Sequence, residues 1–266
     1  MMKIPFLIII SCLLSIAGLA QSVAIQPSIL DFRLAQGGRE TQVIRITNLS
    51  DKKLSFEAYL ADWLRDSTGS HQYFRPDTLK RSCAKWVSLD KTFIEVAPNS
   101  TQELLVSLQG PAGAAAFNEM KWAMLFLQSA SERDSADRRN SSVSTQVKEL
   151  LRVGIHIYQT PPLANKPAAK AIALKPVEGE KRTYEFQMRN TGAAMLQCKA
   201  RLELTNIETG KELKLSNIEF PVFPEGSRKV RFIVPAELPS GKYAALAILD
   251  IGEDYPLEAI EKNIEL

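Results

Sequence analysis

Residues suited to general acid–base catalysis or metal binding are scarce in this chain. It contains two histidines, His71 and His156, far apart in the sequence, and three cysteines. Histidine is the commonest general base and metal ligand, and no Gly-x-Ser-x-Gly, His-Glu-x-x-His, P-loop or dinucleotide-binding glycine pattern is present. We therefore predict a protein that is not an enzyme, with no catalytic residue, no metal site and no cofactor. A dyad assembled by folding from one histidine and a distant serine or aspartate is the enzymatic alternative.

Composition favours a binding or structural protein. The 266 residues are 45% hydrophobic and 24% charged, which suits one large globular domain or two ordinary ones. Lysine and arginine number 33 against 30 aspartates and glutamates. A charge so nearly balanced gives no reason to expect a nucleic-acid partner.

The first twenty residues have the layout of a secretory signal peptide. A short basic start ending at Lys3 precedes an apolar stretch over residues 4–19, which closes in the small-x-small pattern Gly18-Leu19-Ala20. The apolar stretch is shorter than the roughly 20 residues that cross a bilayer. We predict cleavage after Ala20 and a periplasmic or secreted mature protein without a membrane span. An uncleaved anchor and a lipoprotein signal at Cys12 are the alternatives.

The remaining sequence alternates apolar and polar residues in short runs typical of β-strands. Runs rich in β-branched and aromatic residues recur at spacings of roughly ten residues and are separated by turn formers, without helical stripes between them. Such runs lie at residues 42–47, 54–60, 103–108, 152–158, 184–188, 196–204, 229–234 and 243–249. This pattern predicts an all-β protein.

A proline-rich segment divides the pattern in two. Residues 160–167 contain three prolines, which do not fit the interior of a sheet. The two halves also echo each other, because a strand ending in Asn48 is matched by one ending in Asn190. We predict two immunoglobulin-like β-sandwich domains in tandem, with the signal peptide at residues 1–20, the first domain at 21–160, a linker at 161–168 and the second domain at 169–266.

Two further residue types are expected to serve packing. Cys83 and Cys198 fall on opposite sides of the predicted boundary, and Cys198 alternates with apolar residues in a strand. We predict two free buried thiols, with a single disulfide as the alternative. Trp63, Trp86 and Trp122 are expected to fill the core rather than form a carbohydrate platform. His156 alternates with two isoleucines and is expected to be an exposed sheet residue.

Three segments in this order resemble the periplasmic pilus-assembly chaperones of the PapD-like superfamily. They are an early strand and asparagine turn at residues 41–50, a proline turn into a strand at 93–102, and a strand ending in an aromatic residue and proline at 152–161. Residues 59–87 are closer to a non-classical, non-fimbrial branch. The resemblance covers residues 22–162, and the second domain matches only as another sandwich.

The resemblance implies that the last strand of the first domain pairs with a partner protein. Members of the family lend this strand to an incomplete immunoglobulin-like subunit, which is β-strand addition. A polar loop precedes this strand in the sequence. The partner-binding face implied here consists of apolar residues at alternate positions, namely Val147, Leu151, Val153, Ile155 and Ile157. A strand packed into its own sandwich shows the same alternation, so burial in the chain's own core is an equal alternative.

The basic pair of the family is not evident in this sequence. The family anchors the subunit's terminal carboxylate with an arginine in the first strand and a lysine in the last strand of the first domain. The aligned positions here are Leu30 and either Val153 or Ile155, none of them basic. Arg33 and Arg152 lie nearby, displaced in register, and are the candidate carboxylate anchors.

These observations predict a non-enzymatic, chaperone-like protein of the periplasm. Its partner is expected to be another extracytoplasmic protein, such as a pilus or surface subunit, bound by β-strand addition to a monomer or weak dimer. The alternative is a structural or adhesive surface module that uses the same immunoglobulin-like domains without chaperone activity.

Overall fold

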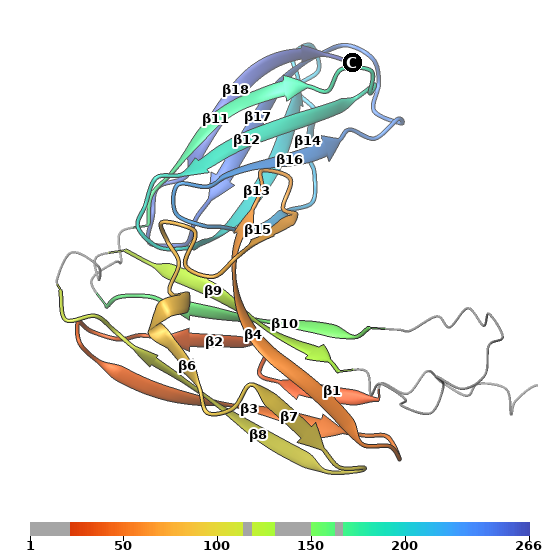
Figure 1. The fold of residues 1–266 in the computed structure, drawn as a ribbon. Helices are drawn as coiled ribbons and strands as arrows, with labels where there is room; N and C mark the ends of the chain where they lie inside the picture. Colours follow the sequence, from red (N-terminus) through yellow and green to blue (C-terminus); the bar gives the residue numbers. More distant parts are fainter. Residues whose placement is uncertain (1–21, 114–118, 131–149, 163–166) are drawn as a thin grey trace, which may run out of the picture.

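Two β-sandwiches follow one another along the chain. The computed structural model describes residues 22–113, 119–130, 150–162 and 167–266, so the predicted signal peptide lies outside the described residues. Within those ranges every regular element is a strand except one turn of 3-10 helix, η1 (Ala84–Trp86). Figure 1 shows the second sandwich stacked on one end of the first. The prediction of an all-β protein with two immunoglobulin-like sandwiches in tandem is confirmed.

The first sandwich consists of a four-stranded and a six-stranded sheet. The four-stranded sheet has the order β1 (Val23–Gln26), β3 (Arg39–Asn48), β8 (Thr101–Gln109), β6 (Val87–Leu89). The six-stranded sheet has the order β2 (Ile29–Phe32), β10 (Arg152–Gln159), β9 (Lys121–Ser129), β4 (Leu54–Arg65), β5 (His71–Phe74), and β7 (Phe93–Val96) also pairs with β4. All pairings are antiparallel except that of β2 with β10.

The second sandwich also consists of two sheets, each with one strand fewer than its counterpart in the first. Its three-stranded sheet has the order β11 (Ala169–Pro176), β12 (Thr183–Asn190), β16 (Ser227–Ile233). Its five-stranded sheet has the order β14 (Glu212–Lys214), β13 (Leu196–Asn206), β17 (Lys242–Asp250), β18 (Glu258–Glu265), and β15 (Ile218–Val222) also pairs with β13. Between the sandwiches, the linker predicted at 161–168 falls in the stretch from the end of β10 to the start of β11.

Alternating apolar residues fill a separate core in each sandwich. In β8, Leu104, Val106 and Leu108 are fully buried while the residues between them are more exposed. In β13, Leu202 and Leu204 behave in the same way. Because successive side chains of a strand point to opposite faces of the sheet, this alternation places one face of each strand in a core and the other outside it.

A buried asparagine closes the same corner in both sandwiches. Asn48, at the end of β3, donates from Nδ2 to the carbonyls of Lys52, Val96 and Ala97. Asn190, at the end of β12, donates from Nδ2 to the carbonyls of Ala194 and Val222. Each asparagine is fully buried, and its side chain ties its own turn to the proline-containing turn of another strand. The similarity between the two halves of the sequence therefore corresponds to the same buried asparagine turn in both sandwiches.

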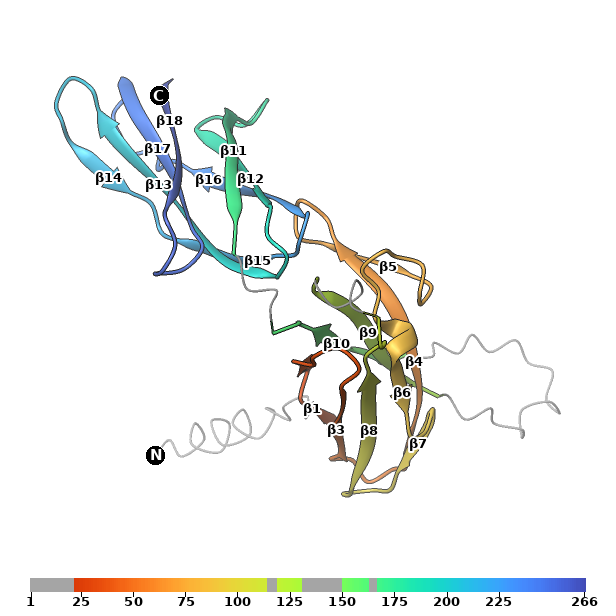
Figure 2. The same ribbon diagram turned by 90° about the vertical axis from the view of Figure 1, so that its left-hand side faces the viewer.

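Strand β4 extends beyond the first sandwich and reaches the second. With β5 it forms a hairpin whose tip lies against β16 of the second sandwich (Figure 2). Within β4 the buried Asp62 accepts hydrogen bonds from the backbone N–H groups of Thr78 and Leu79, each at 2.8 Å, and of Asp77 at 3.2 Å. This carboxylate fixes the loop that follows β5 and presents it to the second domain.

No helix among the described residues is long and apolar enough to cross a membrane.

The aromatic residues Trp63 and Trp122 are buried as expected, but they lie outside both sandwich interiors, in a third cluster between the domains.

Cys83 and Cys198 are free and buried, which confirms the prediction of two separate thiols. Burial is the main cause that raises the pKa of the Cys198 thiol to about 12, and Asp250 adds to it. Burial likewise raises the pKa of Cys83, with a further contribution from Asp62. The thiolate is the reactive form, so neither side chain is poised to react in the folded protein.

We expect a chain that starts at residue 21 to give almost no reaction with a thiol-specific reagent while folded. After unfolding in guanidinium without reductant, two thiols per chain should react, because both cysteines are free. A chain that still shows no reactive thiol after unfolding would contain a disulfide and would contradict the structure.

Candidate functional site

Strand β10 is paired along its whole length on one side and along only half of it on the other. β9 pairs with β10 from Arg152 to Gln159, whereas β2 pairs with it only from His156 onward. Within the part of the chain that the structure describes, residues 152–155 therefore form an open edge of the six-stranded sheet. An open edge presents backbone N–H and C=O groups with which another strand can pair.

The hydrogen-bond alternation identifies the groups that face this edge. The N–H of Ser129 in β9 donates to the carbonyl of Leu151 at 2.8 Å, and the N–H of His156 donates on the other side to the carbonyl of Ser28 at 3.0 Å. Backbone groups of successive strand residues point in opposite directions, so odd-numbered residues of β10 face β9. The N–H and C=O groups of Arg152 and Gly154 consequently face the open edge.

The side chains of the predicted partner-binding face are buried to very different degrees. Ile155 and Ile157 are fully buried in the first core, Val153 is partly buried, and Leu151 is 40% exposed. Val147 lies outside the described residues. Packing in the chain's own sandwich thus accounts for the alternation at Ile155 and Ile157. The apolar side chains left at the open edge are those of Leu151 and Val153.

A cation and several aromatic rings lie on the opposite, outer face of the same edge. The guanidinium of Arg152 lies over the ring of Phe126 at 4.7 Å and over that of Tyr73 at 5.9 Å. Tyr59 and Tyr73 contact Phe126 with ring centroids 5.4 and 5.1 Å apart and remain exposed. This aromatic patch, formed by Tyr59, Tyr73 and Phe126, places a positive charge where the side chains of an added strand would pass.

The two candidate anchors, Arg33 and Arg152, are not brought together. Phe32 pairs with Gln159 at the far end of β10, so Arg33 lies about eight residues along the strand from Arg152. At roughly 3.3 Å per residue their backbones are on the order of 25 Å apart. Arg33 is highly exposed and forms an ion pair with Asp31 at 3.1 Å. The two arginines therefore cannot hold the same carboxylate.

The outer face of the sheet is covered at its other end by the second domain. Phe223 contacts Trp63 and Trp122, each with ring centroids 4.9 Å apart, and Tyr158 at 5.8 Å. All four rings are buried. A single side chain of the second domain thus fills a socket formed by β4, β9 and β10.

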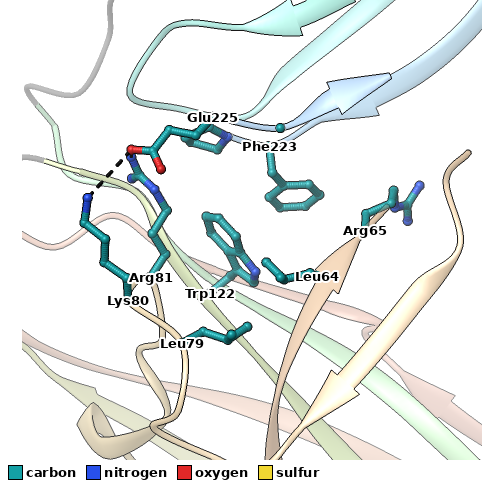
Figure 3. A pocket seen from close by; sticks show the side chains of 10 residues that line it. Leu64, Arg65, Leu79, Lys80, Arg81, Trp122, Phe223 and Glu225 are labelled. Atoms are coloured by element: carbon teal, nitrogen blue, oxygen red, sulfur yellow. Dashed lines mark hydrogen bonds and ion pairs between the residues drawn. The ribbon is translucent and has the colours of Figure 1, made fainter. Parts of the chain in front are cut away.

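Ion pairs border this contact and leave a pocket beside it. Arg81, nearly buried, pairs with Glu225 of the second domain at 2.8 Å and with Glu119 at 3.3 Å. A pocket of about 340 Å³ lies between this pair and the apolar side chains of Leu64, Leu79, Trp122 and Phe223 (Figure 3). Glu225 is the acidic residue of the lining and pairs with Arg81 and, at 3.9 Å, with Lys80, while Arg65 lines the same pocket. The pocket therefore has an apolar floor and a wall that carries more basic than acidic groups.

The two histidines meet at the same junction, which the sequence did not indicate. The ring centroids of His71 and His156 are 5.6 Å apart, and each ring also contacts Trp63. His156 is partly buried, so the expectation of an exposed residue is wrong. The pattern missed this burial because the rings of Trp63, His71 and Tyr158 pack around His156 on the outer face of the sheet.

Desolvation and neighbouring cations keep both imidazoles neutral. Burial is the main cause that lowers the pKa of His156 to about 4, with smaller contributions from His71 and Arg65. Burial and Arg65 also lower the pKa of His71. The Arg65 Nη2 lies 3.1 Å from the His71 Nε2, a geometry in which the neutral imidazole accepts the hydrogen bond.

One sequence signal did point to this junction. Residues 122–127 of β9 are buried without alternation, as in strands that are covered on both faces. The sequence of this strand consists of apolar residues without a polar one between them: Trp122, Ala123, Met124, Leu125, Phe126 and Leu127. Such a run indicates a strand that is covered on both faces.

No cluster of three or more potential metal-ligating side chains occurs in the part of the chain that the structure describes.

Comparisons with known proteins identify the fold but no close relative. No family model and no curated protein sequence matches the chain. One chain of a chaperone–tip adhesin complex of CFA/I fimbriae biogenesis matches with a TM-score of 0.52 and 8% identity, covering 91% of this chain and 98% of that one. One chain of a chaperone–tip adhesion subunit complex from the Csu pili of Acinetobacter baumannii matches with a TM-score of 0.49 and 11% identity over the same shares.

The resemblance to PapD-like chaperones that the sequence suggested is confirmed at the level of the fold. The shared architecture consists of two immunoglobulin-like sandwiches in tandem. Identities this low show the fold alone.

The histidine junction predicts a pH dependence of stability. Between about pH 6.5 and pH 4 the unfolded chain binds a proton that folded His156 does not. The free energy of unfolding should therefore fall as the pH is lowered through this window and should not change on account of His156 above it. We expect His156→Gln to fold and to lose less stability between pH 7 and pH 5 in urea titrations. Equal losses in the variant and the unmodified chain would contradict the assignment.

Proposed function

We propose that this protein is a non-enzymatic, chaperone-like protein of the periplasm that binds another extracytoplasmic protein by β-strand addition. The observation that carries the proposal is the half-open strand β10, whose residues 152–155 pair with β9 and with no second strand among the described residues. A partner strand placed there would extend the six-stranded sheet beyond the end of β2. The predicted signal peptide and the similarity of fold to fimbrial chaperones support this proposal.

Backbone pairing would set the register of the added strand. The N–H and C=O groups of Arg152 and Gly154 are available to it, and each hydrogen bond made in exchange for water contributes about 1 kcal/mol. Specific affinity would come from side chains on the two faces of the strand. Leu151 and Val153 offer apolar contact on one face, where a fully buried side chain contributes about 1.5–3 kcal/mol.

The outer face of the edge favours an acidic or aromatic group in the partner. Arg152 lies beside Phe126 and Tyr73 and forms no ion pair within the described ranges. A carboxylate on the added strand would meet this guanidinium in a charge-assisted hydrogen bond. Of the two candidate anchors, Arg152 is therefore the one that serves strand addition, while Arg33 is engaged with Asp31.

Two variants of one residue separate backbone pairing from side-chain contact. Arg152→Ala and Arg152→Pro both remove the guanidinium, but only the proline removes the N–H that faces the open edge. Proline is tolerated at such edge positions, so both variants should fold. We expect Arg152→Pro to bind the partner about fivefold more weakly than Arg152→Ala, since the loss of one hydrogen bond of about 1 kcal/mol corresponds to that factor. Affinity is measured on the complex recovered from envelope extracts with the mature chain.

Matched apolar variants on the same strand provide the control. Val153→Asp should fold and lose the partner, whereas Ile155→Asp should unfold because that side chain is fully buried in the core. Equal affinity of the Arg152→Pro and Arg152→Ala variants would refute pairing at this edge. Recovery of the protein only as a permanent component of a surface structure, without a bound unassembled subunit, would favour the structural or adhesive module.

A further inference from the structure

The pocket of about 340 Å³ at the domain junction lies beside the socket that receives Phe223 (Figure 3). Its size falls within the range of small-molecule sites, which occur preferentially between domains. The first domain lines it from the end of β4, the loop after β5 and the start of β9, and the second domain lines it from the turn between β15 and β16. A molecule bound in this pocket would therefore contact both domains.

The floor of the pocket is apolar and accessible at two leucines. Leu64 is 39% exposed and Leu79 is partly buried. The rings of Trp122 and Phe223 complete the floor, with centroids 4.9 Å apart, but both rings are almost entirely buried. The two leucines consequently carry most of the apolar surface that a ligand can reach. Removing this surface from water would favour the binding of an apolar group.

Basic groups outnumber acidic ones at the border of the pocket. Arg81 pairs with Glu225 at 2.8 Å and with Glu119 at 3.3 Å. The hydrogen bond from Arg81 is the main cause that lowers the pKa of Glu225, and the charges of Arg81, Lys80 and Arg189 add to it. Three cations thus lie around two carboxylates, which leaves an excess of positive charge at this border.

Lys80 is the cation of the lining that a ligand can reach. Its side chain is 75% exposed, and its ammonium lies 3.9 Å from the Glu225 carboxylate, at the outer limit of an ion pair. An ammonium carries three N–H donors, so donors remain for a ligand within the described ranges. Arg81 is nearly buried between its two carboxylates. Arg65 lies across the pocket from Lys80, where it contacts His71 and adds a further positive charge (Figure 3).

These features select among classes of ligand. The excess positive charge would repel an amine, a neutral apolar molecule would use the floor alone, and an inorganic anion would leave the floor in water. We propose that the junction pocket binds a small carboxylic acid with an aromatic or branched aliphatic body, whose carboxylate pairs with Lys80 and whose body lies on Leu64 and Leu79. This site is separate from the strand-addition edge at residues 152–155, and its test does not depend on a partner protein.

Phenylpropionate is a suitable probe, because it joins one aromatic ring to one carboxylate. A ligand with about eleven non-hydrogen atoms and ordinary efficiency has a Kd on the order of 1 mM. Added to the isotope-labelled mature protein, it should shift the NMR signal of the Trp122 indole N–H. The signal of Trp86, which does not line the pocket, should stay in place. No shift of Trp122 at about 20 mM probe, or equal shifts of both tryptophans, would overturn the proposal.

Phenylpropanol, the uncharged alcohol with the same carbon skeleton, separates the charge from the apolar contact. It should bind about threefold to fivefold more weakly than the carboxylate, because an ion pair with an exposed lysine contributes modestly. Lys80→Gln should remove most of this difference, whereas Leu64→Gln should weaken both probes by a similar factor. Both side chains are exposed, so the variants should fold, and the rest of the NMR spectrum shows whether they do.

Lys199→Gln is the matched control. Lys199 is also an exposed lysine beside a glutamate, 3.6 Å from Glu219, and it lies outside the pocket. Its variant should keep the full difference between the two probes. Equal affinity of the unmodified protein for the carboxylate and the alcohol would refute selection for an anion, and a difference that survives Lys80→Gln unchanged would refute pairing with Lys80.

Discussion

The structure depends on one sheet that is buried on both faces. The six-stranded sheet of the first sandwich packs against its own core on one side and receives Phe223 of the second domain on the other. Burying one such ring stabilises the contact by about 1.5–3 kcal/mol, and Arg81 adds a nearly buried ion pair at its border. This contact sets how the second domain sits on the first, and the surroundings of every polar group at the junction follow from it.

The same contact divides the sheet into two regions with different surroundings. At one end of β10 the second domain covers the outer face through Phe223, and near this contact the two histidines are neutral and Arg65 lies close to Arg228. At the other end the strand is open along one side, with Arg152 and aromatic rings on its outer face. A strand added at this edge would extend the same sheet that carries the domain junction, because β9 and β10 form both the edge and part of the socket for Phe223.

Local pattern was sufficient to predict the sandwiches. Period-two alternation located the strands because each strand faces a core on one side. The asparagine and proline turns recur in both halves because Asn48 and Asn190 each donate a side-chain hydrogen bond to a backbone carbonyl beside a proline-containing turn. The two free thiols followed from the same pattern. Alternation could not show which face is covered a second time, so His156 was expected at the surface and the tryptophans inside a sandwich. Likewise, Ile155 and Ile157 show the same alternation whether they face a partner or the chain's own core.

The sequence by itself determined the fold class, the division into two domains and the strand that ends the first domain, because these depend on residue periodicity within short segments. The tertiary structure alone decided how far β2 extends along β10, and hence which residues form an open edge. It also decided that Arg33 and Arg152 lie apart while Arg65 and Arg228 lie together. Strand register and domain packing bring together residues more than a hundred positions apart in the sequence. The spacing of residues within a short segment does not determine how far apart such residues lie in space.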